Sequence, residues 1–206
     1  MQHNRNVHPA EQLAQAMRRI YAKGYTTTSG GNLSLRDKDG SLWITPTAVD
    51  KGTLSRADIL HVLCDGTVVG KHKVSCDMPF HAAVLKARPD LNCVLHAHSK
   101  ALAAYSAARK ALPLGVLPRI EAEIGRIGTA PYRRPGSKAL GQSIEQAFKK
   151  GCNVVILQNH GVMVGGQSLK DALDKLEKLE RLARICTTAA QAGAALTLPA
   201  CAAVHD

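Results

Sequence analysis

The chain has 206 residues, of which 45% are hydrophobic and 21% are charged, and its formal net charge at pH 7 is +11. This length supports one domain with a substantial core, so we expect a single domain over residues 1–206. The charged fraction and the absence of low-complexity runs argue against disorder. Because the lysines and arginines are dispersed and no aromatic residues alternate with them, we expect no nucleic-acid partner.

Nothing in the sequence predicts a membrane segment. The residues before Pro9 are polar, and no apolar run approaches the roughly 18–20 residues that a membrane span needs. Six cysteines are scattered without a CxxC pair, a pattern that indicates reduced thiols rather than a disulfide framework. We therefore expect a cytoplasmic protein with no membrane partner.

Apolar periodicity and turn residues predict the elements along the chain. The first half predicts a helix at 9–23, strands at 33–36 and 42–45, a hairpin at 59–63 and 68–69, and a helix at 79–88. The second half predicts a buried strand at 93–98, helices at 99–112 and 138–150, a strand at 153–157 that continues at 162–164, and an amphipathic helix at 169–191. Strands and helices alternate, which indicates an α/β or α+β fold with a central sheet covered by helices.

Three histidines form a candidate metal site. His96 and His98 are two positions apart on the predicted strand 93–98, so their side chains are expected on the same face. His160 follows the predicted strand 153–157. Catalytic zinc commonly takes three protein ligands and leaves one position for water or substrate. The pattern predicts Zn²⁺, with Mn²⁺ or Co²⁺ as alternatives. The alternative interpretation of the His96–His98 pair is that one histidine packs in the core, the other is exposed, and neither binds a metal.

Asp77 precedes the predicted helix 79–88 and has two interpretations. An acid at this position is commonly a helix N-cap. Beside a metal that polarises a carbonyl group, the same carboxylate is a candidate general base for the adjacent C–H. The sequence leaves both interpretations open.

Small polar residues form candidate anion-binding loops. They occur at 30–32, at 45–47 and at Ser75, and they offer hydroxyl groups and backbone amides that can hold an anion. Each of these segments, taken singly, is also typical of an ordinary turn.

Five segments occur in the order and spacing of the class II aldolase/adducin family. They are Ser-Gly-Gly-Asn-Leu-Ser at 29–34, Ile-Thr-Pro-Thr at 44–47, Ser-Cys-Asp-Met-Pro-Phe-His at 75–81, Val-Leu-His-Ala-His-Ser at 94–99 and Gln-Asn-His-Gly at 158–161. The chain resembles this family over about residues 10–190. The family includes fuculose-phosphate and rhamnulose-phosphate aldolases, ribulose-phosphate 4-epimerase, methylthioribulose-phosphate dehydratase and a tetronate-phosphate decarboxylase.

The resemblance implies a fold, an assembly and a set of site residues. The fold is a three-layer α/β/α sandwich with a central mixed, largely antiparallel sheet, and the assembly is a homotetramer with active sites at subunit interfaces. Asp77 matches the glutamate that moves the proton in the aldolases. The residues that match the zinc ligands are His96, His98 and His160. The residues that match the binding site for the substrate phosphate are Gly31, Asn32, Thr47 and Ser75.

The chain departs from the family pattern at several positions. Asp77 is one methylene shorter than the aldolase glutamate, although the epimerases of the family also carry aspartate there. Cys76 replaces a second phosphate-binding serine, and Ala48 replaces a glycine. Leu117 aligns with the tyrosine that protonates the leaving group in fuculose-phosphate aldolase. Glu121 lies near the point where the dehydratases place a catalytic glutamate, and its alternative is an acid on a surface helix.

The leading hypothesis is a zinc-dependent lyase that cleaves a short-chain sugar phosphate. It would be a ketose 1-phosphate aldolase similar to fuculose-phosphate aldolase, and its reaction would pass through a metal-stabilised enediolate. The alternative is a sister activity that uses the same ion: a dehydratase, a 4-epimerase or a decarboxylase. A further alternative is an adducin-like interaction module that lacks the metal site. The three histidines and the acid favour an enzyme, but the fold alone does not choose the reaction.

Overall fold

A single mixed sheet lies at the centre of the protein. The computed structural model describes residues 7–193, and the two ends of the expected domain lie outside this range. Within it the strands are β1 (Asn32–Arg36), β2 (Leu42–Ile44), β3 (Leu60–Val62), β4 (Val68–Val69), β5 (Cys93–Ala97), β6 (Ile127–Ala130), β7 (Val154–Leu157) and β8 (Gly161–Gly166). Their order is β4-β3-β2-β1-β5-β8-β7-β6. Neighbouring strands are antiparallel except β6 and β7, which are parallel.

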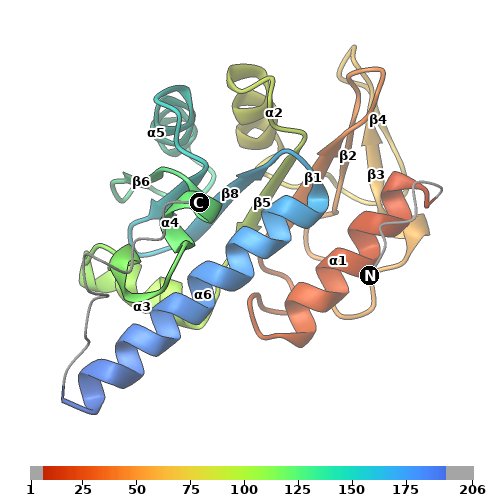
Figure 1. Ribbon diagram of the computed structural model, residues 1–206. Coiled ribbons are helices and arrows are strands. Elements are labelled where there is room, and N and C mark those ends of the chain that lie inside the picture. Colours follow the sequence, from red (N-terminus) through yellow and green to blue (C-terminus); the bar gives the residue numbers. More distant parts are fainter. Residues whose placement is uncertain (1–6, 194–206) are drawn as a thin grey trace.

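Helices cover both faces of the sheet (Figure 1). They are α1 (Pro9–Ala22), α2 (Met78–Ala87), α3 (Lys100–Ala108), α4 (Ile120–Ile124), α5 (Lys138–Lys149) and α6 (Leu169–Gln191). Helices α2 and α5 pack together on one face, whereas α1, α3, α4 and α6 lie on the other. The expected three-layer α/β/α sandwich with a mixed, largely antiparallel sheet is confirmed.

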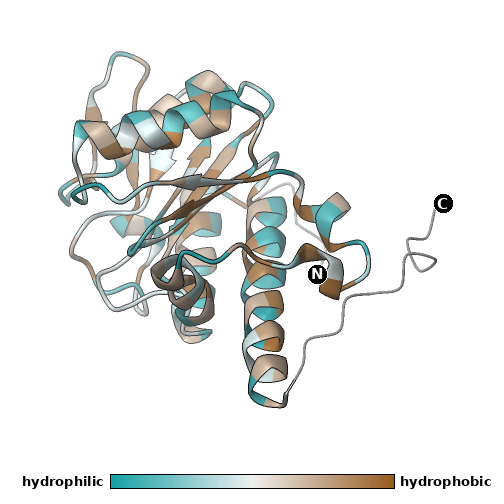
Figure 2. Cartoon of the chain, turned by 90° about the vertical axis from the view of Figure 1, so that its left-hand side faces the viewer, coloured by the Kyte–Doolittle hydropathy of each residue, from teal (hydrophilic) through white to brown (hydrophobic). Residues whose placement is uncertain are grey.

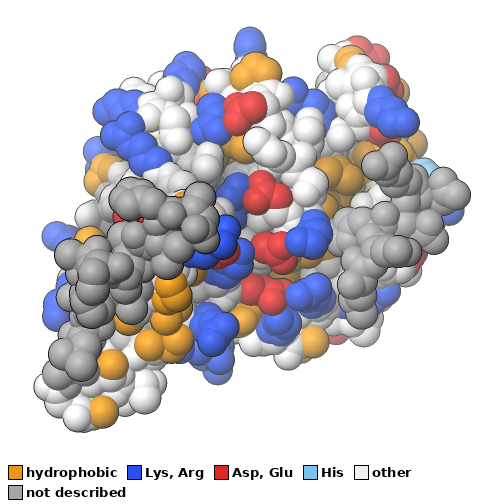
Figure 3. Space-filling model, in the orientation of Figure 1, with side chains coloured by type: hydrophobic (Ala, Val, Ile, Leu, Met, Phe, Trp, Pro, Cys, Tyr) orange, Lys and Arg blue, Asp and Glu red, His pale blue; other side chains and the backbone are white. Residues whose placement is uncertain are grey.

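A large apolar core on each face of the sheet holds the three layers together, and a third, small cluster contains Ile44, Leu60 and Val62. The helices turn their apolar sides toward the strands and their polar sides outward (Figure 2). Charged side chains of both signs are spread over the face that carries α1 and α6, and Lys and Arg do not gather into one patch there (Figure 3). None of the helices within residues 7–193 combines the length and apolar character that a membrane span needs.

Alternation along β5 and β1 decides which polar side chains face α2. Leu95 packs in the core beside α1 and α6, and Val94 packs in the core beside α2 and α5. Because successive side chains of a strand point to opposite faces, His96 lies on the side of α2. Leu33 of β1 belongs to the same core as Leu95, so Asn32 also lies on the side of α2.

The structure departs from the expected elements after residue 99. The helix expected at 99–112 ends at Ala108, because Arg109 has a left-handed backbone conformation with φ of 53°. Helix α4 and strand β6 form where the sequence predicted no element. Strand β6 contains Gly128 and a single large apolar residue, Ile127, which explains why its pattern is weak.

Candidate metal centre and active site

The three predicted histidines lie together near the end of the central strand β5, beside the turn between β7 and β8. The ring centroid of His96 is 4.5 Å from that of His98 and 4.9 Å from that of His160, and the last two centroids are 5.2 Å apart. One candidate ligand nitrogen from each ring lies within 4.8 Å of the other two. Segments that are far apart in the sequence therefore bring three imidazoles to one point.

Backbone hydrogen bonds hold the segments that carry two of these histidines. The amide of His98, one residue beyond the end of β5, donates to Tyr25 O at 3.0 Å. The amide of His160 donates to Leu157 O at 3.1 Å, and the preceding Asn159 has φ of 55°. The turn between β7 and β8 thus returns the chain sharply and presents His160 beside β5.

Two glycines pack against His98. A Cβ atom added to Gly30 would lie 2.8 Å from His98 Nδ1. A Cβ atom added to Gly161 would lie 2.8 Å from His98 Cδ2 and 2.4 Å from Ala97 O. Both distances to the ring are below those that real Cβ atoms adopt, so only glycine at these positions leaves room for the ring.

The donor set fits a divalent metal ion. His96 Nδ1 lies 3.1 Å from Val162 O, so its hydrogen is donated to this carbonyl group and the lone pair of Nε2 faces the cluster. His98 Nε2 is 2.9 Å from His96 Nε2. Within the described residues, His160 Nδ1 is buried without a hydrogen-bond partner. Three imidazoles with such converging or unpartnered nitrogens match the ligand number of a catalytic zinc site.

Burial keeps the three histidines neutral, which is the form that binds metals. Burial and the neighbouring His98 lower the pKa of His96 to about 3. Burial also lowers the pKa of His98, helped by His160, and lowers that of His160. At neutral pH all three rings therefore have a lone pair to offer.

The carboxylate of Asp77 faces the histidines and does not cap the helix. Asp77 occupies the N-cap position of α2, but its side chain makes no capping hydrogen bond. Its Oδ2 accepts a hydrogen bond of 2.7 Å from Asn32 Nδ2 and lies 4.0 Å from His96 Nε2. Burial raises the pKa of Asp77, but the neighbouring His96 and the hydrogen bond from Asn32 outweigh it and hold the pKa below its usual value. Asp77 is therefore a buried, ionised acceptor beside the candidate metal centre.

The candidate anion-binding loops lie next to this acid. Ser75 Oγ accepts hydrogen bonds from Asn32 Nδ2 at 3.0 Å and from the Asp77 amide at 3.2 Å. An isolated bridge pairs Pro46 with Val74 and brings the two loops side by side. Beside this bridge, the Thr47 amide donates to Lys73 O at 3.1 Å.

The same loops contain two residues with a left-handed backbone conformation, Gly31 and Ala48. Gly31 has φ of 64°, and an added Cβ atom would lie 2.7 Å from His96 O. Ala48, where the family resemblance implies a glycine, has φ of 56°. The chain therefore keeps the left-handed backbone that suits glycine and carries a methyl group there.

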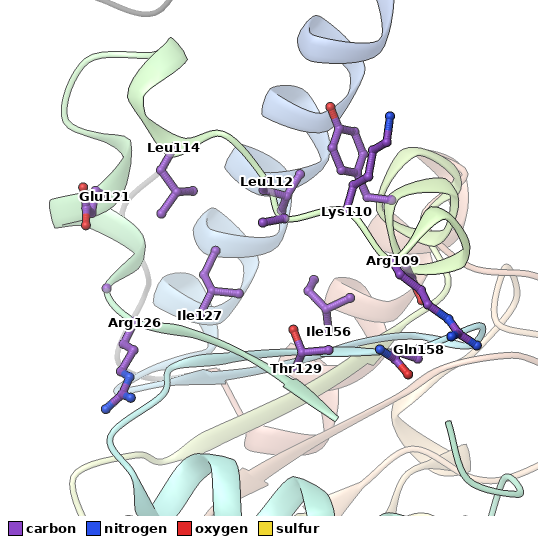
Figure 4. Close-up of a pocket in the computed structure, with 14 residues that line it drawn as sticks. Arg109, Lys110, Leu112, Leu114, Glu121, Arg126, Ile127, Thr129, Ile156 and Gln158 are labelled. Carbon is purple, nitrogen blue, oxygen red and sulfur yellow. The ribbon is translucent and has the colours of Figure 1, made fainter. Parts of the chain in front are cut away.

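The structure does not bring Glu121 to the histidines within one chain. Glu121 is exposed on α4 and lines a cavity of about 780 Å³, together with Gln158 and Arg126. Figure 4 shows Glu121 at one end of this cavity and Gln158 at the other. None of the three histidines lines it. Leu117 is half-buried against the core on the α6 side.

The sequence patterns did not single out His81, which lies beside the candidate site. Its ring is completely buried and hydrogen-bonded to Ser34 and Asn32. The available signal was its position four residues after Asp77, which places both side chains on one face at the start of α2. Lys51, also completely buried, was missed as well; its Nζ donates to Pro46 O at 2.5 Å.

Comparison with known proteins identifies the family. The profile of the family described as Class II Aldolase and Adducin N-terminal domain matches residues 11–187. The chain belongs to the class II aldolase/adducin family. The 3-oxo-tetronate 4-phosphate decarboxylase of Haemophilus influenzae is 33% identical over 168 residues, which are 80% of either chain. The L-fuculose phosphate aldolase of Methanocaldococcus jannaschii is 33% identical over 165 residues, which are 80% of this chain and 88% of that protein.

Solved structures of the family agree with the fold. The crystal structure of Escherichia coli YgbL superposes with a TM-score of 0.85 at 29% identity, over 94% of this chain and 95% of that chain. An L-fuculose 1-phosphate aldolase superposes with a TM-score of 0.83 at 27% identity, over 95% of this chain and 94% of that chain. The similarity thus extends over nearly the whole length of both family members.

Proposed function

We propose that this protein is a metal-dependent lyase that breaks a carbon–carbon bond in a small phosphorylated carbonyl compound and releases the enediolate of dihydroxyacetone phosphate. The observation that carries the proposal is the position of the Asp77 carboxylate, 4.0 Å from His96 Nε2 beside the three clustered imidazoles. An ionised carboxylate at this distance can exchange a proton with a carbon next to a polarised carbonyl group.

Each group of the site has a defined task in this proposal. A divalent metal, Zn²⁺ in the first place and Mn²⁺ or Co²⁺ otherwise, supplies positive charge to the carbonyl oxygen when His96, His98 and His160 hold it. Asp77 holds the proton that the enediolate carbon gains or loses. Ser75 and Thr47, with the backbone at Gly31, bind the phosphate.

The two reactions named for the relatives, aldol cleavage and decarboxylation, lead by their chemistry to the same intermediate. A ketose 1-phosphate carries its carbonyl group at C2, so breaking the C3–C4 bond leaves a carbanion at C3 that is the enediolate of dihydroxyacetone phosphate. In 3-oxo-tetronate 4-phosphate the carbonyl group is at C3, so loss of C1 as carbon dioxide leaves its carbanion at C2. Protonation of either carbanion gives dihydroxyacetone phosphate. The shared step needs the metal centre and Asp77 in both reactions.

The second substrate class is favoured by a specific observation. Aldol cleavage requires a group that takes the proton of the C4 hydroxyl, and Leu117 stands where the aldolase tyrosine is expected. Glu121, the other candidate, is remote from the histidines within one chain. Decarboxylation requires no such group, because carbon dioxide leaves without giving up a proton. A keto acid phosphate is therefore a candidate beside the ketose 1-phosphate.

We propose a homotetramer in the cytoplasm with active sites at subunit interfaces. The family resemblance supports this assembly, and the exposed position of Glu121 on α4 is compatible with a task in the site of a neighbouring subunit. Aldol cleavage and dehydration would both use such a contribution.

The test is a product assay with the purified, zinc-loaded protein. A panel of ketose 1-phosphates and 3-oxo-tetronate 4-phosphate is incubated with the enzyme, and dihydroxyacetone phosphate, aldehyde and carbon dioxide are quantified. Aldehyde with dihydroxyacetone phosphate assigns an aldolase, and carbon dioxide with dihydroxyacetone phosphate assigns a decarboxylase. Loss of water or inversion of a hydroxyl carbon would replace the proposal by a dehydratase or an epimerase. A protein that binds no metal and transforms none of these substrates would favour an adducin-like module.

A further inference from the structure

A buried chain of hydrogen bonds connects β1 and α2 behind the candidate active site. Ser34 Oγ lies 2.7 Å from His81 Nδ1, and His81 Nε2 lies 2.6 Å from Asn32 Oδ1. Asn32 Nδ2 lies 2.7 Å from Asp77 Oδ2 and 3.0 Å from Ser75 Oγ. All five residues are at least nine-tenths buried. The chain ends at the carboxylate that the proposed function uses as its proton carrier.

We propose that His81 is a positioning residue that fixes the side-chain amide of Asn32 and, through it, the direction of the Asp77 carboxylate. The inference rests on the proposed function, because it assigns a purpose to the orientation of Asp77. His81 has no contact with solvent, so it acts through Asn32 and does not touch the substrate.

The donors and acceptors of this chain can be assigned one after another. The ionised carboxylate of Asp77 only accepts hydrogen bonds, so the Asn32 atom that faces it is the amide nitrogen. The amide oxygen of Asn32 then faces His81 Nε2, which must carry a hydrogen. A neutral imidazole has one N–H group, so His81 Nδ1 is an acceptor. The hydroxyl group of Ser34 donates to it. Each polar atom along the chain has one consistent role.

The neutral state of His81 follows from its surroundings. Burial lowers its pKa to about 4, although the charge of Asp77 acts in the opposite direction. A doubly protonated ring would leave Ser34 Oγ as the only partner of a second N–H group, and the hydroxyl hydrogen would lose its acceptor. The Nε2–H tautomer avoids this conflict and keeps the amide of Asn32 in one orientation.

The same assignment separates the tasks of Asn32 and Ser75. Both hydrogens of the Asn32 amide are used, one by Asp77 and one by Ser75. The side chain of Asn32 therefore serves the carboxylate and has no N–H group left for a phosphate. Ser75 Oγ accepts from Asn32 and from the Asp77 amide, so its own hydrogen is available to an anionic ligand. Asn32 and Ser75, adjacent in space, thus serve the proton carrier and the anion respectively.

Kinetics of His81 variants test the proposal. The measured reaction is the exchange of the hydroxymethyl hydrogen of dihydroxyacetone phosphate with deuterated water, followed by proton NMR on the zinc-loaded protein. His81→Leu leaves the amide oxygen of Asn32 unpaired, and a misdirected carboxylate should lower kcat roughly 100-fold. KM and zinc content should change less than about 3-fold, because neither the anion-binding groups nor the histidine ligands are altered. His81→Gln offers an N–H group toward Asn32, so its kcat should be at least tenfold higher than that of His81→Leu.

The control is His72→Leu, a half-buried histidine that is hydrogen-bonded to Asp58; it should leave kcat and KM unchanged. Wild-type kcat in His81→Leu would overturn the proposal. Equal losses in His81→Gln and His81→Leu would also overturn it, because a structural role in packing does not depend on the N–H group.

A direct measurement keeps the inference testable if His81→Leu does not fold. Nitrogen-15 NMR of the zinc-loaded protein, labelled at histidine and assigned with His81→Gln, distinguishes the two neutral tautomers of the ring. We expect the Nε2–H tautomer at neutral pH, and an Nδ1–H tautomer or a charged ring would overturn the proposal. If the wild-type protein catalyses no exchange, the proposed function fails, whereas the tautomer still decides how His81 is bonded.

Discussion

The carboxylate oxygen Oδ2 of Asp77 lies 4.0 Å from Nε2 of His96, although Asp77 is the N-cap residue of helix α2 and His96 lies within strand β5. The contact arises because β5 turns His96 toward the layer that contains α2. The carboxylate makes no capping hydrogen bond and is held by Asn32 instead. This relationship joins a candidate proton carrier to a candidate metal centre, and each of the predictions on catalysis depends on it.

Removal of one imidazole should remove the metal. His98→Ala deletes one of three clustered donors, and we expect loss of bound zinc together with activity. Elemental analysis of the purified variant measures the zinc content, with His72→Ala as the matched control. If His98→Ala retained a full equivalent of zinc, the assignment of His98 as a ligand would be wrong.

Removal of the charge on Asp77 should separate metal binding from proton transfer. Asp77→Asn keeps the size of the side chain but cannot accept the proton, so exchange at the substrate carbon should fall by roughly 10²–10⁴-fold with zinc retained. Exchange is measured on dihydroxyacetone phosphate in deuterated water. Asp65→Asn, on an exposed turn, is the control. Unchanged exchange in Asp77→Asn would exclude Asp77 as the base.

The hydroxyl group of Ser75 should contribute to phosphate binding. Ser75→Ala removes a hydrogen bond to a charged group, worth about 1.5–3 kcal/mol, so KM for dihydroxyacetone phosphate should rise roughly 10- to 100-fold. KM for dihydroxyacetone should change much less. Ser143→Ala, whose exposed hydroxyl group donates to Ala139 O, serves as the control. A parallel rise for both compounds would argue against a phosphate contact.

Space beside the His98 ring should depend on Gly161. Gly161→Ala places a Cβ atom 2.4 Å from Ala97 O and 2.8 Å from His98 Cδ2, so the strand end and the ring must shift. We expect a loss of about 1–3 kcal/mol in the free energy of unfolding and weaker zinc binding. Gly115→Ala is the matched control, because an added Cβ atom there meets no atom within 4 Å. Equal stability and zinc affinity in both variants would show that the ring does not need this space.

The buried Lys51 should make stability depend on alkaline pH. Burial lowers its pKa from 10.5 to about 8, so between these values the unfolded chain binds more protons than the folded protein. The contribution of Lys51 to stability therefore rises with pH across this window and is lost as the pH falls to 8. Between pH 8 and pH 10, the free energy of unfolding of the wild-type protein should therefore rise by up to about 2 kcal/mol relative to that of Lys51→Met. Urea unfolding of both proteins at the two pH values measures this change. A constant difference would contradict the lowered pKa.

Several features of the site follow from sequence alone because they are local. The i and i+2 spacing of His96 and His98 predicts a shared face, since strand geometry alternates with a period of two. Their rings do meet, although the strand itself ends at Ala97. The glycine after His160 marks a tight return of the chain. Such short-range patterns predicted most helices and strands. The resemblance carried by the five motifs indicated the family and implied the three layers.

Other features were decided only by the tertiary structure. The sequence left Asp77 open between a cap and a base, and the packing of α2 against β1 and β5 turned its carboxylate toward His96. The resemblance implies a catalytic role for Glu121, yet α4 places it in a separate cavity that none of the three histidines lines. The buried hydrogen bonds of His81 join residues 47 and 49 positions apart. Sequence periodicity describes one helix or strand at a time, whereas these contacts depend on how two elements pack together. That packing is chosen so that few polar atoms in the core remain without a hydrogen-bond partner.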